Sequence, residues 1–437
     1  MIGYAVGVLI TLIVLGVALG YSFGSATFLY FVLQDDNVGQ VVSVAFRTID
    51  SFTYLAIPFF LLAGSIMQNG GLSRRLIDFV GTFTGWLKGG MAATLVGAGT
   101  LFGAISGSSV ASVSAIGRIM SDGMAARGYS RKFVGGLTAT SGIIGILIPP
   151  SVPMIVYGTS AGVSIGDMFL AGITSGLLMA VLLILNALLW ARRQPGIDDK
   201  AGILLTRNTS NDNKNKRFDL FKGGIKRFGI AVPALLTPVI ILGGIYSGTF
   251  TPTESGALAC AYALLVGLFV YRELRPSHLA KTFLDGILAT APILFIIALG
   301  GAFSRALLLS GLPQKIASSI GELAVPNWVL IILLNVVLLV VGMFVEENTA
   351  IVILVPLLAP IAEELGINLI QFGVIMVLNL GIGLVTPPFA PNLFVAASAC
   401  NVPFHRMVKY ALKLTLLSAG PTLLIANIFP TFSTWFI

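Results

Sequence analysis

The sequence predicts an all-α polytopic membrane protein made of inverted repeats, with two re-entrant helical hairpins and two proline-broken helices. Three observations lead to this fold class. Hydrophobic residues make up 56% of the 437 residues and charged residues only 10%, whereas soluble domains carry about 25% charged residues. Long apolar runs recur along the whole chain, and one proline-rich motif occurs twice.

The apolar runs predict roughly ten membrane crossings plus shorter pieces, because a helical span needs about 20 apolar residues. The first run lacks the basic start and the cleavage site of a signal peptide, so we expect it to be one retained helix. The runs lie near residues 2–33, 53–69, 89–117, 133–161, 165–191, 228–246, 254–271, 286–304, 327–345, 348–361, 368–400 and 407–431.

The two halves of the chain share a motif. "GIIGILIPPSVPMIVYG" begins at Gly142, and "GIGLVTPPFAPNLFVA" begins at Gly381. The matching prolines lie 238 residues apart, and they are Pro149, Pro150 and Pro153 in the first half and Pro387, Pro388 and Pro391 in the second. We count five crossings between the two proline pairs, and an odd number inverts the second copy. Prolines also interrupt helices, so each motif predicts a broken helix of the kind that forms binding sites in secondary transporters.

The charge distribution predicts the topology. The net charge is +8, but the basic residues lie in loops beside the spans, so membrane orientation explains them better than nucleic acid binding. The loop 192–227 holds ten Lys or Arg and is predicted to be cytoplasmic. Alternation from this loop places 23 of the 26 basic residues inside and leaves only Arg47, Arg305 and Lys315 outside.

This topology requires two hairpins that do not cross the membrane. The segment between Lys88 and Arg131 must begin and end on the cytoplasmic side, with its turn at "SGSSVAS", residues 106–112. The equivalent segment 327–364 enters from the other face, with its turn at "VEENTA", residues 345–350. Irregular backbone at membrane depth must be buried in protein or line a cavity, so both tips and both breaks are expected to meet at one site.

The residue types at these positions indicate a site that binds both a cation and an anionic substrate. Interrupted helices free backbone carbonyl groups near 145–149 and 383–387, and neutral side-chain oxygens come from Ser106, Ser108, Ser109, Asn348, Thr349 and Thr386. Hard cations such as sodium bind ligands of this type. The helix N-termini after the proline pairs favour an anionic substrate, such as a carboxylate. The candidate substrate-binding residues are Pro149, Pro150, Ser151, Pro387, Pro388 and Asn392.

Acidic residues leave alternatives open. Glu346 and Glu347 are adjacent carboxylates inside an apolar region, so they are either coupling acids or a hairpin turn open to water. Asp122 lies four residues after Arg118, and this spacing predicts an ion pair. Glu254 is expected either to sit at a helix N-terminus or to form a contact between the two halves.

These elements suggest the following regions along the chain. They are an N-terminal scaffold at 1–51, first-repeat scaffold and arm helices at 52–88, the first hairpin and broken helix at 89–164, a connecting helix at 165–191, the basic loop at 192–227, second-half scaffold helices at 228–285, second-repeat scaffold and arm helices at 286–326, the second hairpin and broken helix at 327–402, and a C-terminal helix at 403–437.

Four motifs occur in a fixed order over nearly the whole chain: "SGSSVASVSAIG", "GILIPPSVPMIVYG", "GTFTPTESGA" and "GLVTPPFAPNLFVA". In this order they resemble the large membrane subunit of tripartite ATP-independent periplasmic (TRAP) transporters. The resemblance implies sodium-driven uptake of an organic acid, either sialic acid or a C4-dicarboxylate, by an elevator motion in the bacterial inner membrane. Of the two, the sialic-acid branch is the one favoured by the resemblance.

The same resemblance implies partners and an ion site. It implies a periplasmic substrate-binding protein and a small four-helix membrane subunit, which is expected to be a separate polypeptide because this chain starts almost at the first helix of the large subunit. No cofactor is implied, and Na⁺ is the coupling ion. The sodium sites of the family carry over to Ser106, Ser108, Ser109, Gly145 and Ile148, with second-half counterparts at Asn348, Thr349, Gly383 and Thr386.

Three other functions are weighed against this one. A proton-coupled symporter would use Glu346 or Glu347 at the second tip. A channel is less favoured, because about 200 residues per half exceed what a pore needs. An intramembrane enzyme is disfavoured, because the sequence has no HExxH and no CxxC motif.

Overall fold

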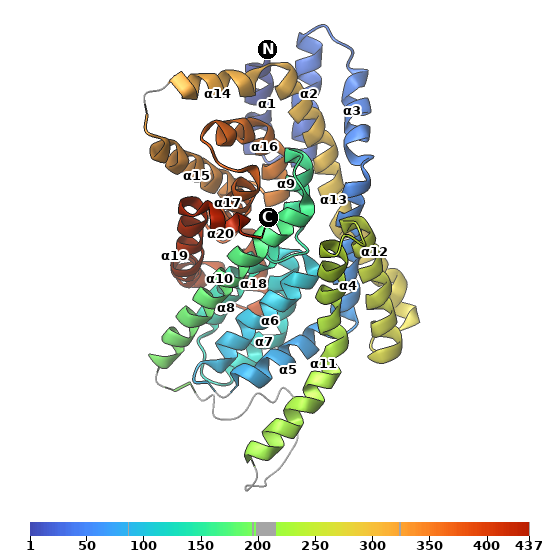
Figure 1. Cartoon of the computed structure of the whole chain (residues 1–437), viewed down its shortest axis with the longest axis vertical. Helices are drawn as coiled ribbons and strands as arrows, with labels where there is room; N and C mark the ends of the chain where they lie inside the picture. The colour runs from blue at the N-terminus through green and yellow to red at the C-terminus, as the bar shows by residue number, and fades with distance from the viewer. Residues whose placement is uncertain (86, 195, 198–215, 323–324, 437) are drawn as a thin grey trace.

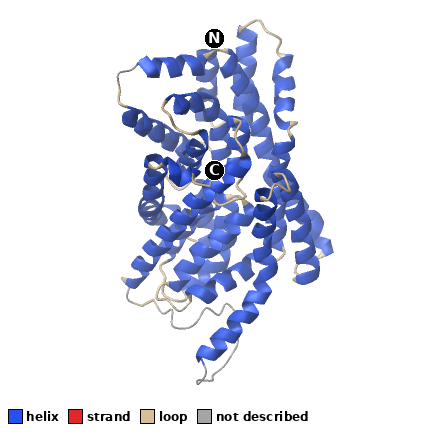
Figure 2. Cartoon of the chain, in the orientation of Figure 1, coloured by secondary structure: helices blue, strands red, loops and turns tan. Residues whose placement is uncertain are grey.

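The computed structural model describes residues 1–436 except 86, 195, 198–215 and 323–324. Every regular element in these residues is a helix (Figure 2). The first part of the chain forms α1 (Ile2–Val14), α2 (Leu19–Leu33), α3 (Gly39–Ile49), η1 (Phe52–Leu55), α4 (Ala56–Asn69), α5 (Leu72–Thr84), α6 (Gly90–Ser106), α7 (Ser109–Ala125), α8 (Arg131–Leu147), α9 (Val152–Ala161) and α10 (Ile165–Arg192). The second part forms α11 (Lys216–Tyr246), α12 (Pro252–Leu265), η2 (Val266–Val270), α13 (Pro276–Leu309), α14 (Leu312–Glu322), α15 (Asn327–Phe344), α16 (Glu347–Glu364), α17 (Leu369–Gly383), α18 (Pro391–Cys400), α19 (Phe404–Ile428) and α20 (Pro430–Thr434).

The helices have the lengths and surfaces of a polytopic membrane protein. Among the described residues, 7 helices are long and apolar enough to cross a membrane, or up to 8 if the bent pair α8 and α9 counts as one span. The long helix α10 exposes Leu177, Val181, Leu185 and Leu189 by 51–53% at a spacing of four residues. Such a stripe of exposed apolar side chains fits contact with lipid rather than with water.

The first apolar run is the clearest difference from the expected elements. We expected one retained helix near residues 2–33, but the run forms α1 and α2, which pack against each other. Gly16, between them, has φ 79°, a left-handed conformation that glycine adopts at no steric cost. Hydropathy is continuous through this turn and therefore does not reveal it.

Polar residues at helix starts account for several boundaries. The hydroxyls of Ser108, Ser151 and Ser164 each accept a hydrogen bond from a backbone N–H in the first turn of α7, α9 and α10. At the start of α12, Thr251 and Glu254 form a reciprocal capping box. Of the two expected roles for Glu254, the helix N-terminal role is therefore confirmed.

The basic segment lies partly outside the described residues. Helix α10 runs to Arg192 and α11 begins at Lys216, so helix occupies both ends of the segment that we expected to be a loop. Residues 198–215 are not described.

The hairpins and broken helices of the two halves exchange partners. Helix α16 of the second hairpin packs against α9, and α18, which follows the second break, packs against α7 and α8. Figure 1 shows α16 beside α9 and α18 beside α7 and α8, although these segments are far apart in the sequence. Each hairpin is thus seated on the broken helix of the other half.

Candidate transport site

The first hairpin ends in a compact turn between α6 and α7. Helix α6 ends at Ser106, Gly107 has φ 62°, and α7 follows Ser108. The Ser108 hydroxyl accepts a hydrogen bond from the N–H of Ala111 at 3.4 Å. The interruption is narrower than the turn expected from Ser106 to Ser112, because the cap starts α7 directly after Ser108.

Neutral oxygens gather at this turn. The Ser106 hydroxyl is 2% exposed and lies 3.5 Å from the Ser108 carbonyl oxygen and 3.4 Å from the Ser112 hydroxyl. These separations are longer than the usual O–H···O distance of about 2.5–3.0 Å. Two oxygens bound at right angles to a hard cation at about 2.4 Å would lie about 3.4 Å apart. The turn is therefore spaced like part of a cation site.

The first tip lies directly against the first helix break. A Cβ atom on Gly103 would lie 2.3 Å from the Cα atom of Gly145, and one on Gly107 would lie 2.6 Å from the Pro150 carbonyl oxygen. The N–H of Val152 also donates to the Gly107 carbonyl oxygen at 3.3 Å. Only glycine permits so close an approach of the two backbones, and it places Gly145 beside the serine turn.

A serine bridges the two parts of the first broken helix. Helix α8 ends at Leu147 and α9 begins at Val152, with a bend of 42°. Ser151, between them, is fully buried; its hydroxyl donates to the Ile146 carbonyl oxygen at 2.5 Å and accepts from the Met154 N–H at 3.3 Å. The hydroxyl of this candidate substrate-binding residue is thus engaged in joining the helix ends.

The second tip is held by an acid. Helix α15 ends at Phe344, and the Glu346 carboxylate caps α16. It accepts hydrogen bonds from the Thr349 N–H at 3.1 Å, from the Thr349 hydroxyl at 3.2 Å and from the Asn348 side-chain amide. These three hydrogen bonds fix the position of the carboxylate at the start of α16. Glu347 lies in the first turn of α16 and is 6% exposed.

Asn348 supplies an oxygen with no partner. Because its amide nitrogen donates to Glu346, its Oδ1 atom is turned elsewhere, and this atom is buried without a hydrogen bond in the described part of the chain. A buried, unpaired acceptor is costly unless something binds it. An amide oxygen is a suitable ligand for a hard cation, so the second tip fits a sodium ion as well.

The second tip and second break repeat the contact seen in the first half. A Cβ atom on Gly383 would lie 2.3 Å from the carbonyl carbon of Gly342, and the N–H of Phe389 donates to the Met343 carbonyl oxygen at 3.3 Å. Thr386 lies in this break, where its hydroxyl donates to the Ile382 carbonyl oxygen at 2.7 Å. Gly383, Asn348 and Thr349 therefore belong to one tip-and-break unit.

Asn392 connects the two halves. It lies in the first turn of α18, and its amide nitrogen donates to the Ser109 hydroxyl at 2.6 Å and to the Ala139 carbonyl oxygen at 3.3 Å. Its Oδ1 atom is buried and has no partner among the described residues. Ser109 therefore faces the second half rather than the oxygens around Ser106.

The remaining predicted residues lie at the edges of these units. Ile148 directly follows the end of α8, and its side chain lies against Gly176 of α10. Pro149 and Pro150 are buried, whereas Pro387 is partly buried and Pro388 is exposed.

Two contacts differ from the sequence analysis. Asp122 forms its ion pair with Arg131 at 2.8 Å, so the expected pair with Arg118 is wrong. The hairpin glycines Gly103 and Gly342, which contact the glycines of the two breaks, were not among the candidate residues. They are 239 residues apart while the prolines are 238 apart, so a search at one fixed offset misses them.

This arrangement defines a class of protein. A helical membrane protein in which two interrupted hairpins meet two interrupted helices, with buried neutral oxygens at each meeting point, has the architecture of a secondary transporter.

The family comparison names this class more closely. Residues 6–432 match the family described as the tripartite ATP-independent periplasmic transporter, DctM component. The chain belongs to this family and is a large membrane subunit of a TRAP transporter in the bacterial inner membrane.

Curated relatives cover almost the whole chain. A C4-dicarboxylate TRAP transporter large permease protein DctM of Pseudomonas aeruginosa is 40% identical over 90% of this chain and 88% of its own length. A sialic acid TRAP transporter large permease protein SiaM of Vibrio cholerae is 33% identical over 96% and 94%. An isethionate TRAP transporter permease protein DctMQ of Oleidesulfovibrio alaskensis is 36% identical over 97% of this chain but 64% of its own length. All three are permeases rather than enzymes.

A solved structure shares the fold. The YdaH transporter of Alcanivorax borkumensis, whose crystal structure has an unusual topology, aligns with a TM-score of 0.62 over 89% of this chain and 88% of its own. At 14% identity this likeness concerns the fold alone.

Proposed function

We propose that this chain is the permease subunit of a sodium-coupled, binding-protein-dependent importer of an organic acid. The observation that carries the proposal is the pairing of each hairpin tip with a helix break through two glycines, Gly103 with Gly145 and Gly342 with Gly383. Each pair brings neutral oxygens and interrupted backbone together inside the protein. Secondary transporters bind coupling ions and substrates with parts of this kind.

Sodium is the coupling ion that best suits these oxygens. Around the first tip they are the Ser106 and Ser112 hydroxyls and the Ser108 carbonyl. At the second tip the unpartnered Oδ1 of Asn348 is available. Neutral oxygens at these spacings suit a hard cation, so we expect at least one ion at each tip.

The substrate is expected to be a small organic anion. Helix α18 begins beside the exposed part of the second break, and a helix N-terminus favours negative charge. The relatives named for C4-dicarboxylate, isethionate and sialic acid are 40%, 36% and 33% identical, so identity separates these classes little. A C4-dicarboxylate and sialic acid are the first two substrates to test.

Transport would involve partners and a large motion. We expect a separate small four-helix membrane subunit and a periplasmic substrate-binding protein, as the family description implies. In an elevator motion the two hairpins and two broken helices would move as one body against the remaining helices. Saturable uptake that requires the binding protein would distinguish this mechanism from a channel.

The test is uptake by proteoliposomes that contain this chain and its small subunit. Candidate binding proteins, each loaded with succinate or sialic acid, are added outside under an inward sodium gradient. We expect uptake of one of the two acids that requires both sodium and the binding protein. Uptake that needs neither would contradict the proposal.

Proton symport is the second candidate, and the buried carboxyl group of Glu347 is the observation that favours it. Glu346 already accepts three hydrogen bonds as the cap of α16, so Glu347 is the residue to vary first. In a Glu347→Gln variant we expect sodium-driven uptake to persist. If uptake instead follows an imposed pH gradient and is lost in this variant, the coupling ion is the proton.

A further inference from the structure

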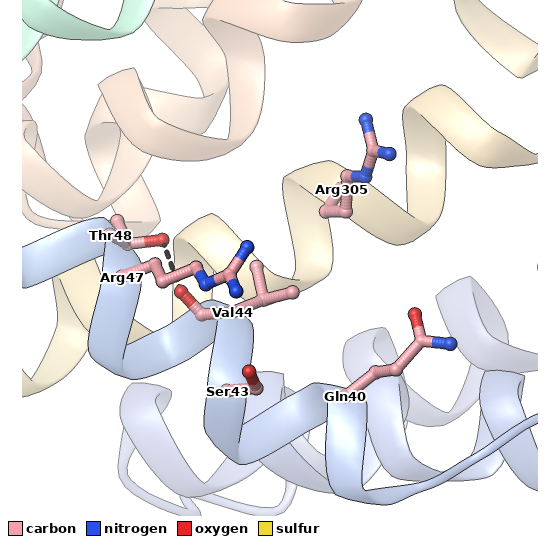
Figure 3. A pocket seen from close by; sticks show the side chains of 6 residues that line it. All are labelled: Gln40, Ser43, Val44, Arg47, Thr48 and Arg305. Carbon is pink, nitrogen blue, oxygen red and sulfur yellow. Dashed lines mark hydrogen bonds between the residues drawn. The ribbon is translucent and has the colours of Figure 1, made fainter.

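A cavity of about 550 Å³ lies between α3 and α13, and none of its lining residues belongs to a hairpin tip. Its size falls within the range of about 300–1,000 Å³ that is usual for small-molecule sites. Figure 3 shows the six side chains that line it: Gln40, Ser43, Val44, Arg47, Thr48 and Arg305.

One face of α3 forms most of the cavity. Its lining residues are spaced three and four apart from residue 40 to residue 48, so they share one side of the helix. At the end of this row the two helices touch, because a Cβ atom on Gly301 of α13 would lie 2.4 Å from the Thr48 side chain. The contact closes one end of the cavity and holds its two walls at a fixed separation.

Two arginines come from opposite walls. Figure 3 shows Arg47 extending from α3 into the space between the helices and Arg305 rising from α13. The ion pairs of the described residues are Arg75 with Glu273 and Arg131 with Asp122, so neither cavity arginine has an acidic partner there. Both arginines are exposed, and two guanidinium groups on the walls of one cavity form a region of positive charge that an anion can bind.

The neighbouring polar groups include one carboxylate. Asp36 accepts hydrogen bonds from the Gln40 side chain at 3.1 Å and from the Asn37 N–H at 2.7 Å, and among the described residues it forms no ion pair with either arginine. The Thr48 hydroxyl donates to the Val44 carbonyl oxygen at 2.8 Å, as the dashed line in Figure 3 marks. The cavity therefore offers two cations and the exposed Ser43 hydroxyl to a ligand.

The location of this charge is unusual for the chain. Arg47 and Arg305 are two of the three basic residues that the charge distribution predicts outside the cytoplasm, and both line this cavity. Positive charge on that side is otherwise almost absent from the sequence. A single cavity thus holds most of the outward-facing basic charge.

We propose that this cavity binds a small organic acid, preferably one with two carboxylate groups, at a site separate from the transport site. Guanidinium groups bind carboxylates through paired, charge-assisted hydrogen bonds, and two of them suit two acid groups. The site would hold the acid on the outer face between its release from the binding protein and its arrival at the hairpin tips. This entry role rests on the proposed function, but the binding itself can be measured without transport.

The test uses succinate as the probe. Radiolabelled succinate is titrated onto the purified chain in nanodiscs of zwitterionic lipid, in sodium-free buffer of low ionic strength. We expect saturable binding that weakens about tenfold or more when Arg47→Gln or Arg305→Gln removes one charge-assisted partner. Lys315→Gln, which removes the third outside charge away from the cavity, is the matched control and should bind as the wild type does.

Each other result decides against the proposal. Absence of saturable succinate binding to the wild type, or equal binding by the double arginine variant, would overturn it. Loss of succinate binding in nanodiscs with anionic phosphatidylglycerol would assign the cavity to a lipid headgroup. Uptake by the double variant that recovers fully with more binding protein would assign it to protein docking. Failure of sodium-driven uptake alone leaves the binding result intact, so the two proposals fail separately.

Discussion

The two helix breaks share a motif but differ in length and burial. The first break spans residues 148–151 and is buried throughout, including both prolines. The second spans residues 384–390, and Phe389 within it is 63% exposed. A repeated proline pair therefore fixes where each helix ends but not what the break faces. The first break is packed inside the protein, and the second lies partly on its surface.

The largest expected effect comes from adding a methyl group where backbones touch. Gly103→Ala and Gly383→Ala would each place a Cβ atom 2.3 Å from backbone of the partner glycine. Overpacking costs about 1–3 kcal/mol and shifts backbone, so we expect both variants to lose most uptake. Thermal unfolding in detergent and uptake by proteoliposomes measure the two effects.

The control for this pair lies on the same helix. A Cβ atom on Gly99 of α6 would meet only the Ser141 side chain, with its hydroxyl at 3.4 Å, so Gly99→Ala should keep both stability and uptake. Normal uptake by Gly103→Ala would show that the first tip does not depend on its backbone contact.

Replacing the prolines should separate the two breaks. We expect Pro149→Ala with Pro150→Ala, and equally Pro387→Ala with Pro388→Ala, to impair uptake while membrane insertion stays nearly intact. The first double variant should also lower thermal stability, because its prolines are buried, whereas the second should lower uptake with little change in stability. Wild-type uptake by both would mean that the breaks are incidental.

Removing a tip hydroxyl should alter the sodium requirement more than stability. The Ser106 hydroxyl has only long hydrogen bonds, so Ser106→Ala is expected to cost about 1 kcal/mol or less. If this oxygen binds sodium, the concentration that gives half-maximal uptake should rise several-fold. Ser108→Ala and Thr349→Ala should act in the same direction.

A matched serine tests whether this effect belongs to the tip. Ser141→Ala removes a hydroxyl that donates to the Thr138 carbonyl oxygen at 2.8 Å, away from the turn, and should leave sodium dependence unchanged. An identical shift in Ser141→Ala would remove the case for ion binding at Ser106.

The smallest effect is expected for the ion pair between Arg131 at the start of α8 and Asp122 of α7. Arg131 pairs with the exposed Asp122 at 2.8 Å and donates to the Cys400 carbonyl oxygen at 3.3 Å, linking α8 to the end of α18. Exposed pairs contribute about 0–1 kcal/mol, so Arg131→Gln should lower the melting temperature slightly and Arg118→Gln less still. A large drop for Arg131→Gln would mean that this link carries the contact between the halves.

The sequence predicts the breaks and tips well, because proline, glycine and serine act through local backbone geometry. The starts of α16 at Glu347 and of α7 at Ser109 fall inside the expected turns. Contacts that depend on the tertiary fold were harder to predict from the sequence. Asp122 has Arg118 at helical spacing, yet it pairs with Arg131, which only the folded hairpin brings near. The tip glycines are hidden by the abundance of glycine, 50 in all.

The exchange of partners between the halves also limits how the molecule can move. Since α16 rests on α9 and α18 rests on α7, with Asn392 bonded to Ser109, neither repeat can travel while the other stays behind. If the proposed sodium coupling holds, an ion bound at one tip would act on a body that also contains the other tip. The substrate and its coupling ions would cross the membrane in one movement. A state in which only one hairpin has moved, and through which ions could leak, would be disfavoured.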